Sequence, residues 1–385
     1  MPTKELRVAI IGYQFMGKAH SNAWLQASRF FDLPLKPVLQ VACGRNEAAL
    51  QAFADNWGWK SIETDWRKVV ERDDVDVVDI SLPQHLHHEV AIAAARAGKH
   101  LFCEKPMALK SSDAEAMLVA AEQAKVTHYV NHNYRRTPAV RLARQLINEG
   151  RLGRIFHWRG AYQQDWIVDP EFPLTWHLRK ETAGSGPHGD LNSHSVDLAH
   201  YLVGDIRTVS CLTANFIKER PLPGDGAATF TAGSGSMGRG EVTVEDASLM
   251  MVEFANGAIG SFEATRFAPG RKNRNTFEIY GSEGALAFDL ERMNELQFHS
   301  RTDPAHAQGF RTILATESCH PYIQHWWPPG HIIGYEHGFT HAVADFVDAV
   351  ANGKPIDPDF HDGLKCIRVL EAALKSAASG QRQIL

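Results

Sequence analysis

The chain of 385 residues is 44% hydrophobic and 22% charged, with a formal net charge of −5. This composition is typical of a globular protein, and the length exceeds what one hydrophobic core usually supports, so we expect two domains. The sequence has no long apolar run and no basic stripe, which argues against a membrane-spanning protein and against a protein that binds DNA or RNA.

The first residues have the pattern of a dinucleotide-binding turn. Residues 8–11 form an apolar run too short for a helix, followed by Gly12 and later by Gly17. A buried strand that turns tightly into a helix would point the first N–H groups of the helix at a pyrophosphate. Gly12 and Gly17 fit the first and third glycines of the G-x-G-x-x-G fingerprint, but Gln14 replaces the second. An ordinary strand–turn–helix explains this stretch equally well, so the rest of the chain must decide.

Strand and helix patterns alternate over the first third of the chain. Short apolar strands are expected at 37–43, 75–81, 100–103 and 126–131, with helices between them. Such alternation with short connections predicts a doubly wound parallel sheet, that is, a Rossmann domain over residues 1–130, whose ligand lies at the carboxyl ends of the strands. The residues expected to bind the cofactor there are Gly12, Gln14, Phe15, Met16, Gly44, Arg45, Ser81, Leu82, Pro83, His85, Glu104 and Lys105.

Polar residues mark several of the expected helix starts. Asn46 and Asp65 precede helices expected at 47–56 and 66–71, where their side chains can cap first-turn N–H groups. Ser112 and Glu115 have the spacing of a capping box at the start of a further helix.

The second expected strand ends in Gly44-Arg45, where a dinucleotide-binding domain usually has an Asp or Glu for the adenosine ribose. Loss of that carboxylate removes its repulsion of a 2′-phosphate, and Arg45 could pair with the phosphate. The guanidinium could equally stack on the adenine and leave a plain ribose to neutral donors. The sequence therefore permits both NAD and NADP.

Residues 131–385 follow a different pattern and are expected to form a second, α+β domain. Strands follow one another with few helices, which predicts a large, mostly antiparallel sheet with one open face. The segment 255–258, Ala-Asn-Gly-Ala, has the sequence of a type I′ hairpin. The glycine-rich stretch 224–240 is expected to be a loop, because no strand-to-helix pattern encloses it. Strands are expected at 155–162, 207–214, 247–254, 258–266, 276–280, 285–290 and 295–299, and helices at 138–150, 193–202, 336–351 and 362–379.

Two stretches carry side chains suited to catalysis. In Glu104-Lys105-Pro106 the proline restricts the backbone before it, which holds Lys105 at the mouth of the sheet; a solvated lysine in a surface turn is the alternative. Asp190 and His194 are four residues apart at the expected start of a helix, on one face. A carboxylate beside an imidazole fixes its tautomer and raises its basicity, as a general base requires. The alternative is that Asp190 is an N-cap and His194 a core residue.

Three motifs in this order resemble the glucose–fructose oxidoreductase/inositol dehydrogenase/MocA family. They are the opening glycine turn at 12–20, the segment 98–106 with its Glu-Lys-Pro, and Asp-Leu-Asn-Ser-His-Ser-Val-Asp at 190–197. The segments 164–170 and 330–337, together with the first turn, are similar to the sugar-oxidising branch of the family that contains levoglucosan dehydrogenase. The resemblance spans nearly the whole chain.

This resemblance implies NAD(P)-dependent oxidation of a secondary hydroxyl of a sugar, an anhydrosugar or a cyclic polyol such as inositol. Lys105, Asp190 and His194 match the family's catalytic lysine, aspartate and histidine, with His194 as the general base. A comparable Gly-Arg pair accompanies NAD in the similar branch, which favours NAD and leaves NADP possible. The resemblance also implies that Asn133, Gln164, Asp165, Trp166 and Tyr335 hold the substrate together with Asp190 and His194.

Two other functions fit part of the sequence. A zinc hydrolase could use His85, His87, His88, Asp190 or His194 as ligands. However, adjacent histidines on a helix point in different directions, and no third ligand has recognisable spacing, so we expect no metal site. A non-catalytic sensor of the same fold is the second alternative, although the presence of the lysine, aspartate and histidine together speaks against it.

The sequence also indicates where the protein works and in what form. The five cysteines are widely spaced without a C-x-x-C pair, which argues against a disulfide framework. The N-terminus lacks the apolar segment of a signal peptide, so we expect a cytoplasmic protein. An open sheet face favours a homodimer or homotetramer.

Overall fold

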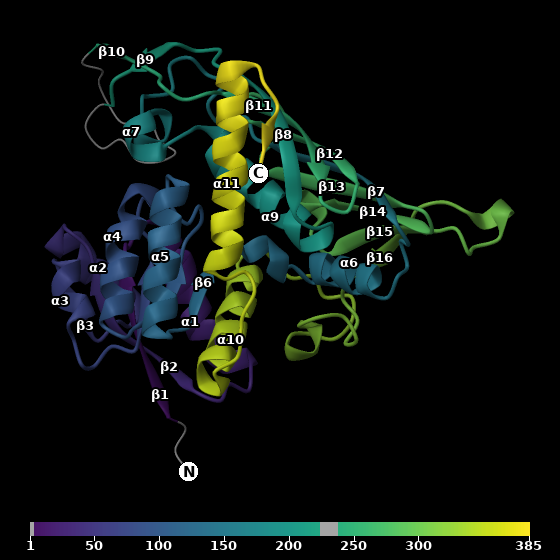
Figure 1. The fold of residues 1–385 in the computed structure, drawn as a ribbon. Coiled ribbons are helices and arrows are strands. Elements are labelled where there is room, and N and C mark those ends of the chain that lie inside the picture. The colour runs from purple at the N-terminus through teal and green to yellow at the C-terminus, as the bar shows by residue number, and fades with distance from the viewer. Residues whose placement is uncertain (1–3, 224–237) are drawn as a thin grey trace. The chain divides into compact units, whose positions relative to one another are not determined.

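The computed structural model describes residues 4–223 and 238–385 (Figure 1). The chain forms two compact units. The first comprises the residues up to Thr137 together with Tyr322–Ile367, and the second comprises Pro138–Pro321 together with Arg368–Leu385. The units differ from the expected division at residue 130, because residues 322–367 pack with the N-terminal part of the chain.

The first unit contains a six-stranded sheet in the order β3-β2-β1-β4-β5-β6, and every neighbouring pair is parallel. This is the predicted doubly wound sheet. The order reverses between β1 and β4, which makes their carboxyl ends the topological switch point where such sheets bind ligands. The strands are β1 (Glu5–Ile11), β2 (Lys36–Cys43), β3 (Ser61–Glu63), β4 (Val77–Ile80), β5 (His100–Cys103) and β6 (His128–Val130).

The helices of the first unit begin largely where the sequence predicts. The side chain of Asn46 caps α2, and that of Asp65 caps α3, each by accepting a backbone N–H. The predicted capping box is wrong: α5 begins at Ser111, so Ser112 already lies inside the helix, and the N-cap residue is Lys110. The helices are α1 (Phe15–Phe30), α2 (Glu47–Trp57), α3 (Trp66–Val70), α4 (His87–Arg96), α5 (Ser111–Ala124) and α10 (His337–Asn352), with short 3₁₀ turns η1 (Gln84–Leu86), η2 (Asn133–Arg136) and η6 (Ile323–His325).

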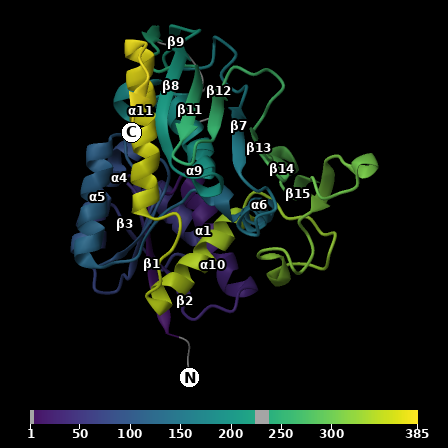
Figure 2. The ribbon, with the colours of Figure 1, turned by 45° about the vertical axis from the view of Figure 1, so that its right-hand side comes forward.

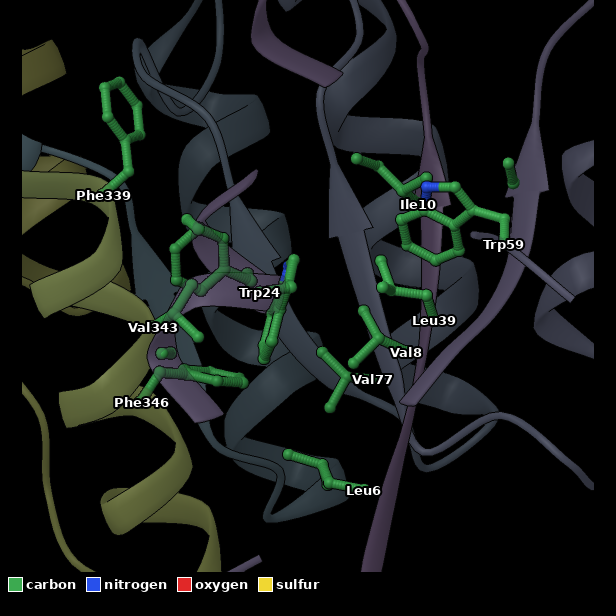
Figure 3. Packing of buried hydrophobic residues seen from close by; sticks show 14 of the residues in the cluster. Leu6, Val8, Ile10, Trp24, Leu39, Trp59, Val77, Phe339, Val343 and Phe346 are labelled. Carbon is green, nitrogen blue, oxygen red and sulfur yellow. The ribbon is translucent and has the colours of Figure 1, made fainter. Parts of the chain in front are cut away.

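The core of the first unit explains why residues from the end of the chain join it. Phe339, Val343 and Phe346 have i, i+4, i+7 spacing, so they form one apolar face of α10. Figure 3 shows this face beside Trp24 of α1, and all four side chains belong to one buried cluster with the strands. Since burying one such side chain contributes about 1.5–3 kcal/mol, the face stabilises the docking of α10 on α1.

The second unit contains a nine-stranded sheet in the order β16-β15-β14-β13-β7-β12-β11-β8-β17. Figure 2 shows the part of this order from β15 to β8. The pair β7–β12 is parallel and the other neighbouring pairs are antiparallel, as predicted for a mostly antiparallel sheet. The strands are β7 (Ile155–Gln163), β8 (Ile206–Ala214), β11 (Ala247–Phe254), β12 (Ile259–Thr265), β13 (Arg274–Gly281), β14 (Gly284–Asp289), β15 (Glu295–Ser300), β16 (Arg311–Leu314) and β17 (Gln383–Ile384).

Two details of this unit differ from the sequence prediction. The β11–β12 hairpin forms, but not with a type I′ turn: among the described residues, Asn256 is not one of the non-glycine residues with positive φ, whereas Gly257 has φ +86°. The glycine-rich stretch 224–240 lies outside the described residues at 224–237. Its last residues belong to β10 (Arg239–Glu241), which pairs with β9 (Glu219–Pro221).

Helices cover one face of the nine-stranded sheet. α9 (Asn192–Leu202) packs on β7 and β12, and α6 (Pro138–Asn148) packs on β14 and β15. Short helices α7 (Lys180–Ala183) and α8 (Pro187–Asp190) precede α9, and α11 (Phe360–Ser379) ends in this unit. Along β11 the residues alternate between buried and exposed, with Met250 buried and Met251 exposed. None of the helices in the described part of the chain is long and apolar enough to cross a membrane.

Candidate active site

Two glycines allow β1 to turn closely into α1. Gly12 has φ +110°, and a Cβ on it would lie 2.3 Å from the backbone oxygen of Ser81 at the end of β4. A Cβ on Gly17 would lie 2.3 Å from the backbone oxygen of Gly12. Both positions therefore require glycine, and they bring α1 against the switch point of the sheet.

The start of α1 is suited to an anion. Gln14 is the N-cap residue of α1 and makes no side-chain capping hydrogen bond, and both Gln14 and Phe15 are exposed. The dipole of this 16-residue helix favours negative charge at that end. These residues fit a dinucleotide pyrophosphate although the middle glycine of the fingerprint is missing.

The end of β2 has an aromatic ring where the usual acid would lie. A Cβ on Gly44 would lie 2.3 Å from the ring of Tyr13, so a side chain at this position would have to displace the ring. Arg45, the next residue, is exposed. The sequence shows the Gly-Arg pair, but not that Tyr13 takes up the space beside it.

The ends of β4 and β5 carry the other predicted cofactor residues. Pro83 and His85 are exposed, and Leu82 and Lys105 are half-buried. Ser81 faces inward: its hydroxyl bonds Asp79 Oδ1 at 2.9 Å. The predicted dinucleotide contacts of Leu82, Pro83, His85 and Lys105 stay predictions.

A buried charged cluster lies under these strand ends. His20 of α1 has Nδ1 2.7 Å from Asp79 Oδ1 and Nε2 2.9 Å from Glu104 Oε1, and its side chain is fully buried. Burial alone would lower the pKa of His20, but the charge and hydrogen bond of Asp79, followed by those of Glu104, raise it to about 10. His20 is therefore an imidazolium that donates to two carboxylates.

Glu104 is the member of this cluster that the sequence assigns to the cofactor. Its Oε1 also accepts from Asn131 Nδ2 at 2.6 Å, and its Oε2 accepts from the backbone N–H of Lys105 at 3.1 Å. The side chain is buried. Protein groups therefore bind both carboxylate oxygens, and a contact of Glu104 with the cofactor stays a prediction.

The second unit holds Asp190 and His194. Asp190 ends α8 and His194 lies in the first turn of α9, so the two residues occupy consecutive helices and not the single helix start expected from the sequence. Asp190 Oδ2 accepts from Arg266 Nη2 at 2.6 Å. The Arg266 side chain is 1% exposed and that of Asp190 is 35% exposed. Arg266 is not among the residues predicted from the sequence, because no local motif marks it.

A chain of polar and aromatic contacts continues from this ion pair. The Arg266 guanidinium lies 5.1 Å from the centroid of the Trp166 ring, and Trp166 Nε1 donates to Gln164 Oε1 at 2.8 Å. Gln164 Nε2 and the Tyr162 hydroxyl both donate to Asn273 Oδ1, at 2.9 and 2.7 Å. The Tyr162 ring is 5.8 Å from that of His194. This cluster, from Asp190 to His194, combines hydrogen-bonding heads with flat apolar faces.

The remaining predicted substrate residues differ in their surroundings. Asp165 Oδ2 accepts from Lys272 Nζ at 2.8 Å and from Gly270 N at 3.0 Å, and the hydrogen bond from Lys272, followed by that from Gly270, lowers its pKa. Asn133 and Tyr335 lie in the first unit, where Asn133 is buried and the Tyr335 ring is 5.3 Å from that of Phe339. Lys105 also belongs to the first unit, whereas Asp190 and His194 belong to the second.

Metal ligation finds no support in the part of the chain that the structure describes. It contains no group of three or more His, Cys, Asp or Glu side chains placed to hold a metal ion. His87 is buried, with its ring nitrogens 2.8 Å from the carbonyl oxygen of Leu82 and 3.1 Å from that of Pro106. The five cysteines are free thiols.

Comparison with known proteins identifies the class. Residues 6–132 match the oxidoreductase family with an NAD-binding Rossmann fold, and residues 140–287 match the GFO/IDH/MocA C-terminal domain. Levoglucosan dehydrogenase of Pseudarthrobacter phenanthrenivorans is 44% identical over 378 residues, 97% of each chain. Two solved structures align over 99% of both chains: an oxidoreductase domain protein from Kribbella flavida, 51% identical with a TM-score of 0.94, and levoglucosan dehydrogenase in complex with NADH and levoglucosan, 42% identical with a TM-score of 0.93.

The fold and these matches define an oxidoreductase with an NAD-binding Rossmann domain. The chain belongs to the Gfo/Idh/MocA family, which confirms the family predicted from the sequence motifs. The turn into α1 fits the cofactor, because Gly12 and Gly17 let the N-terminus of α1 lie close to the switch point of the sheet, where its dipole favours an anion.

Proposed function

We propose that the protein oxidises a secondary hydroxyl of a sugar, an anhydrosugar or a cyclic polyol to the ketone, with NAD as the hydride acceptor. The observation that supports this most directly is the cluster from Asp190 through Arg266, Trp166 and Gln164, because an ion pair beside aromatic and amide side chains suits a hydroxylated ring. The similarity to levoglucosan dehydrogenase points to the same substrate class.

In the mechanism that we propose, His194 removes the proton from the reacting hydroxyl as general base. Asp190 orients the imidazole, and Arg266 holds the Asp190 carboxylate in place. Lys105 stabilises the negative charge that develops on the substrate oxygen. Bound NAD supplies the acceptor for the hydride from the same carbon. Proton transfer by a positioned base contributes about 10²–10⁴-fold to the rate, and the remainder comes from holding the substrate in a reactive geometry.

Substrate positioning falls first to Gln164 and Trp166. Their side chains are half-buried and already bonded to each other, so they present a fixed edge and a flat face. Asp165 is a weaker candidate than the sequence suggests, because its carboxylate is bound by Lys272. Asn133 and Tyr335 complete the proposed set.

NAD is the preferred cofactor in this proposal, and NADP stays possible. Gly44 stands where an acid would bind the ribose and the Tyr13 ring lies beside it, while the exposed Arg45 can stack or pair. Comparing kcat/KM for the two cofactors decides the choice: a higher value with NADP would reverse it.

We also propose that copies of the chain associate through the open face of the nine-stranded sheet as a homodimer or homotetramer. Leu212, Leu249 and Met251 are at least half exposed there, and Leu249 lies opposite Leu212 across the β8–β11 pair. Exposed apolar side chains grouped on one sheet face usually mark an interface. A cytoplasmic location stays a prediction.

The proposal is tested by incubating the enzyme with NAD or NADP and a panel of levoglucosan, glucosides and inositols while the reduced cofactor is followed at its absorbance band. We expect turnover with at least one member of the panel. Dinucleotide binding without turnover on any compound would instead favour the alternative, a non-catalytic dinucleotide-binding sensor.

A further inference from the structure

The cluster around His20 is a buried and densely hydrogen-bonded group of charges in the first unit, and the mechanism above does not use it. It joins four elements: His20 comes from α1, Asp79 from β4, Glu104 from the end of β5 and Asn131 from the end of β6. Trp24 Nε1 adds a 2.7 Å hydrogen bond to Asp79 Oδ2. Buried charges are costly unless they are paired and fully hydrogen-bonded, so this arrangement calls for a role.

Its most informative contact leads to the proposed catalytic lysine. Glu104 and Lys105 are adjacent, and the Glu104 carboxylate accepts the backbone N–H of Lys105 at 3.1 Å. The other oxygen of the same carboxylate is held by His20 Nε2 and Asn131 Nδ2. The side chain of Glu104 is thus fixed in the interior, and it fixes in turn the backbone from which Lys105 extends.

We propose that His20 is a positioning residue for Lys105, acting through the Glu104 carboxylate to hold the lysine backbone at the carboxyl end of β5. This inference rests on the proposed function, in which Lys105 stabilises the charge on the substrate oxygen. It assigns the Glu104 side chain to the support of the site and not to the cofactor.

The surroundings of His20 make this support rigid. The rings of Phe102 and Phe339 lie 5.3 and 5.6 Å from the imidazole, and Ser81 Oγ is 3.1 Å from Nδ1. The charged groups that face the ring are therefore Asp79 and Glu104, with Lys105 next in line beyond Glu104. Burial would raise the pKa of Glu104, but the hydrogen bond and charge of His20, followed by the charge of Lys105, lower it overall.

A double-mutant cycle separates positioning from general stability. We expect Lys105→Ala to lower kcat about 10²–10³-fold, the usual loss of one donor to a developing oxyanion. His20→Gln should lower kcat about 10–100-fold, because small displacements of a catalytic group are that costly. In the Lys105→Ala background, His20→Gln should have almost no further effect on kcat. Equal fold-losses in both backgrounds would overturn the proposal.

A matched control is available on the same strand. His100 begins β5 at its other end, where Nδ1 accepts the backbone N–H of Thr127 at 3.0 Å. His100→Gln removes a partly buried histidine of the same unit without touching Glu104, so we expect near-normal kcat. If it lowers kcat as much as His20→Gln, the effect is one of general stability and the proposal fails.

Hydrogen exchange gives a readout that is independent of activity. The amide of Lys105 should exchange at least about tenfold faster in His20→Gln than in the wild type, because its acceptor is released, whereas amides of β1 should not change. Should His20→Gln fail to fold, Glu104→Gln keeps the shape of the side chain and is measured in the same way. Unchanged exchange at Lys105 in the folded variant would overturn the positioning role.

The two failures can be told apart. Wild-type turnover in Lys105→Ala would remove the lysine from the mechanism and so contradict the proposed function, and the exchange measurement would then decide the positioning alone. A large loss in Lys105→Ala with additive effects of His20→Gln would leave the proposed function intact and overturn only this inference.

Discussion

The charged clusters of the two units differ in their exposure to solvent. In the first unit, His20, Asp79 and Glu104 are each at most 4% exposed, and His20 bonds both carboxylates. In the second, the Asp190 side chain is 35% exposed although its partner Arg266 is buried. We call the first group, His20, Asp79 and Glu104, the closed cluster, because it is buried and can act only through the backbone that it holds. We call the second group, which extends from Asp190 and Arg266 to His194, the open cluster, because the Asp190 carboxylate is bonded to a buried partner and is still accessible to a ligand.

The two sheets show the same contrast. The central strand β4 of the first unit is buried on both faces, since all four residues of Val77–Ile80 are buried. In β11 of the second unit the burial alternates, and the exposed positions include Leu249 and Met251. The central strand β4 of the first sheet thus exposes no side chain, whereas the second sheet exposes apolar side chains on one face.

The largest loss of kcat should come from a substitution in the open cluster, at His194. We expect His194→Ala to lower kcat about 10²–10⁴-fold because it removes the proposed general base, while the dissociation constant for NAD changes little. The control is His157→Ala, an exposed histidine on β7 of the same unit. Steady-state kinetics and a cofactor titration measure both. A variant with wild-type turnover would remove His194 from the role of base.

Alkaline pH should weaken the closed cluster. Burial alone would lower the pKa of His20, but Asp79 and then Glu104 raise it to about 10. The ion pairs of His20 therefore contribute fully to the stability of the fold below the ordinary histidine pKa near 6.5. This contribution is lost as the pH rises through about 10. Between these values the free energy of unfolding should fall by up to about 1.4 kcal/mol per pH unit from this residue. Urea unfolding at several pH values measures the slope, which should be flatter in His20→Gln.

An equal slope in the wild type and in His20→Gln would show that His20 does not carry its charge in the folded state. The closed cluster would then not be a charge-paired group, because a neutral His20 could not donate to Asp79 and Glu104 at the same time.

Substitutions of Arg266 test whether this buried side chain holds the Asp190 carboxylate in place. We expect Arg266→Met to lower kcat about 10–100-fold, since the buried support of Asp190 is lost and a misplaced catalytic group is costly, and Arg266→Lys to lose less because it keeps the charge. Arg207→Met, which breaks the exposed pair with Glu253, is the matched control and should have little effect. Equal kcat in Arg266→Met and the wild type would show that Asp190 needs no such anchor.

Local patterns in the sequence predict much of this fold. The strand-to-helix turn at Gly12, the caps at Asn46 and Asp65, and the β11–β12 hairpin each depend on a few consecutive residues, and each is present. The predictions of the turn type at Asn256 and of the start of α5 are wrong, because the same short sequence is compatible with several backbone conformations. The spacing of the apolar residues in α10 predicts a helix, but it does not predict that the helix packs against α1.

The contacts that define the candidate site are less predictable. Arg266 and Asp190 are 76 residues apart, and His20 and Glu104 are 84 apart, so no spacing rule connects them. Lys105, Asp190 and His194 are candidates from the sequence because they lie in motifs, whereas the residues that contact them or their neighbours lie in ordinary strands and helices. The space that Tyr13 takes beside Gly44 likewise appears only in three dimensions.

The smallest effect on the protomer, and the sharpest test of the open sheet face, should come from a Leu249→Lys/Met251→Lys double variant. Both side chains are exposed, so the protomer's free energy of unfolding should change by no more than about 0.5 kcal/mol per site. Association through this face should be lost, because lysines would have to be desolvated in an apolar contact. Light scattering coupled to gel filtration measures the mass, and Val119→Lys, an exposed apolar site on α5 of the first unit, is the control. If the double variant keeps the mass of the wild-type assembly, the open face is not the interface, and the exposed apolar residues of the second unit need another explanation.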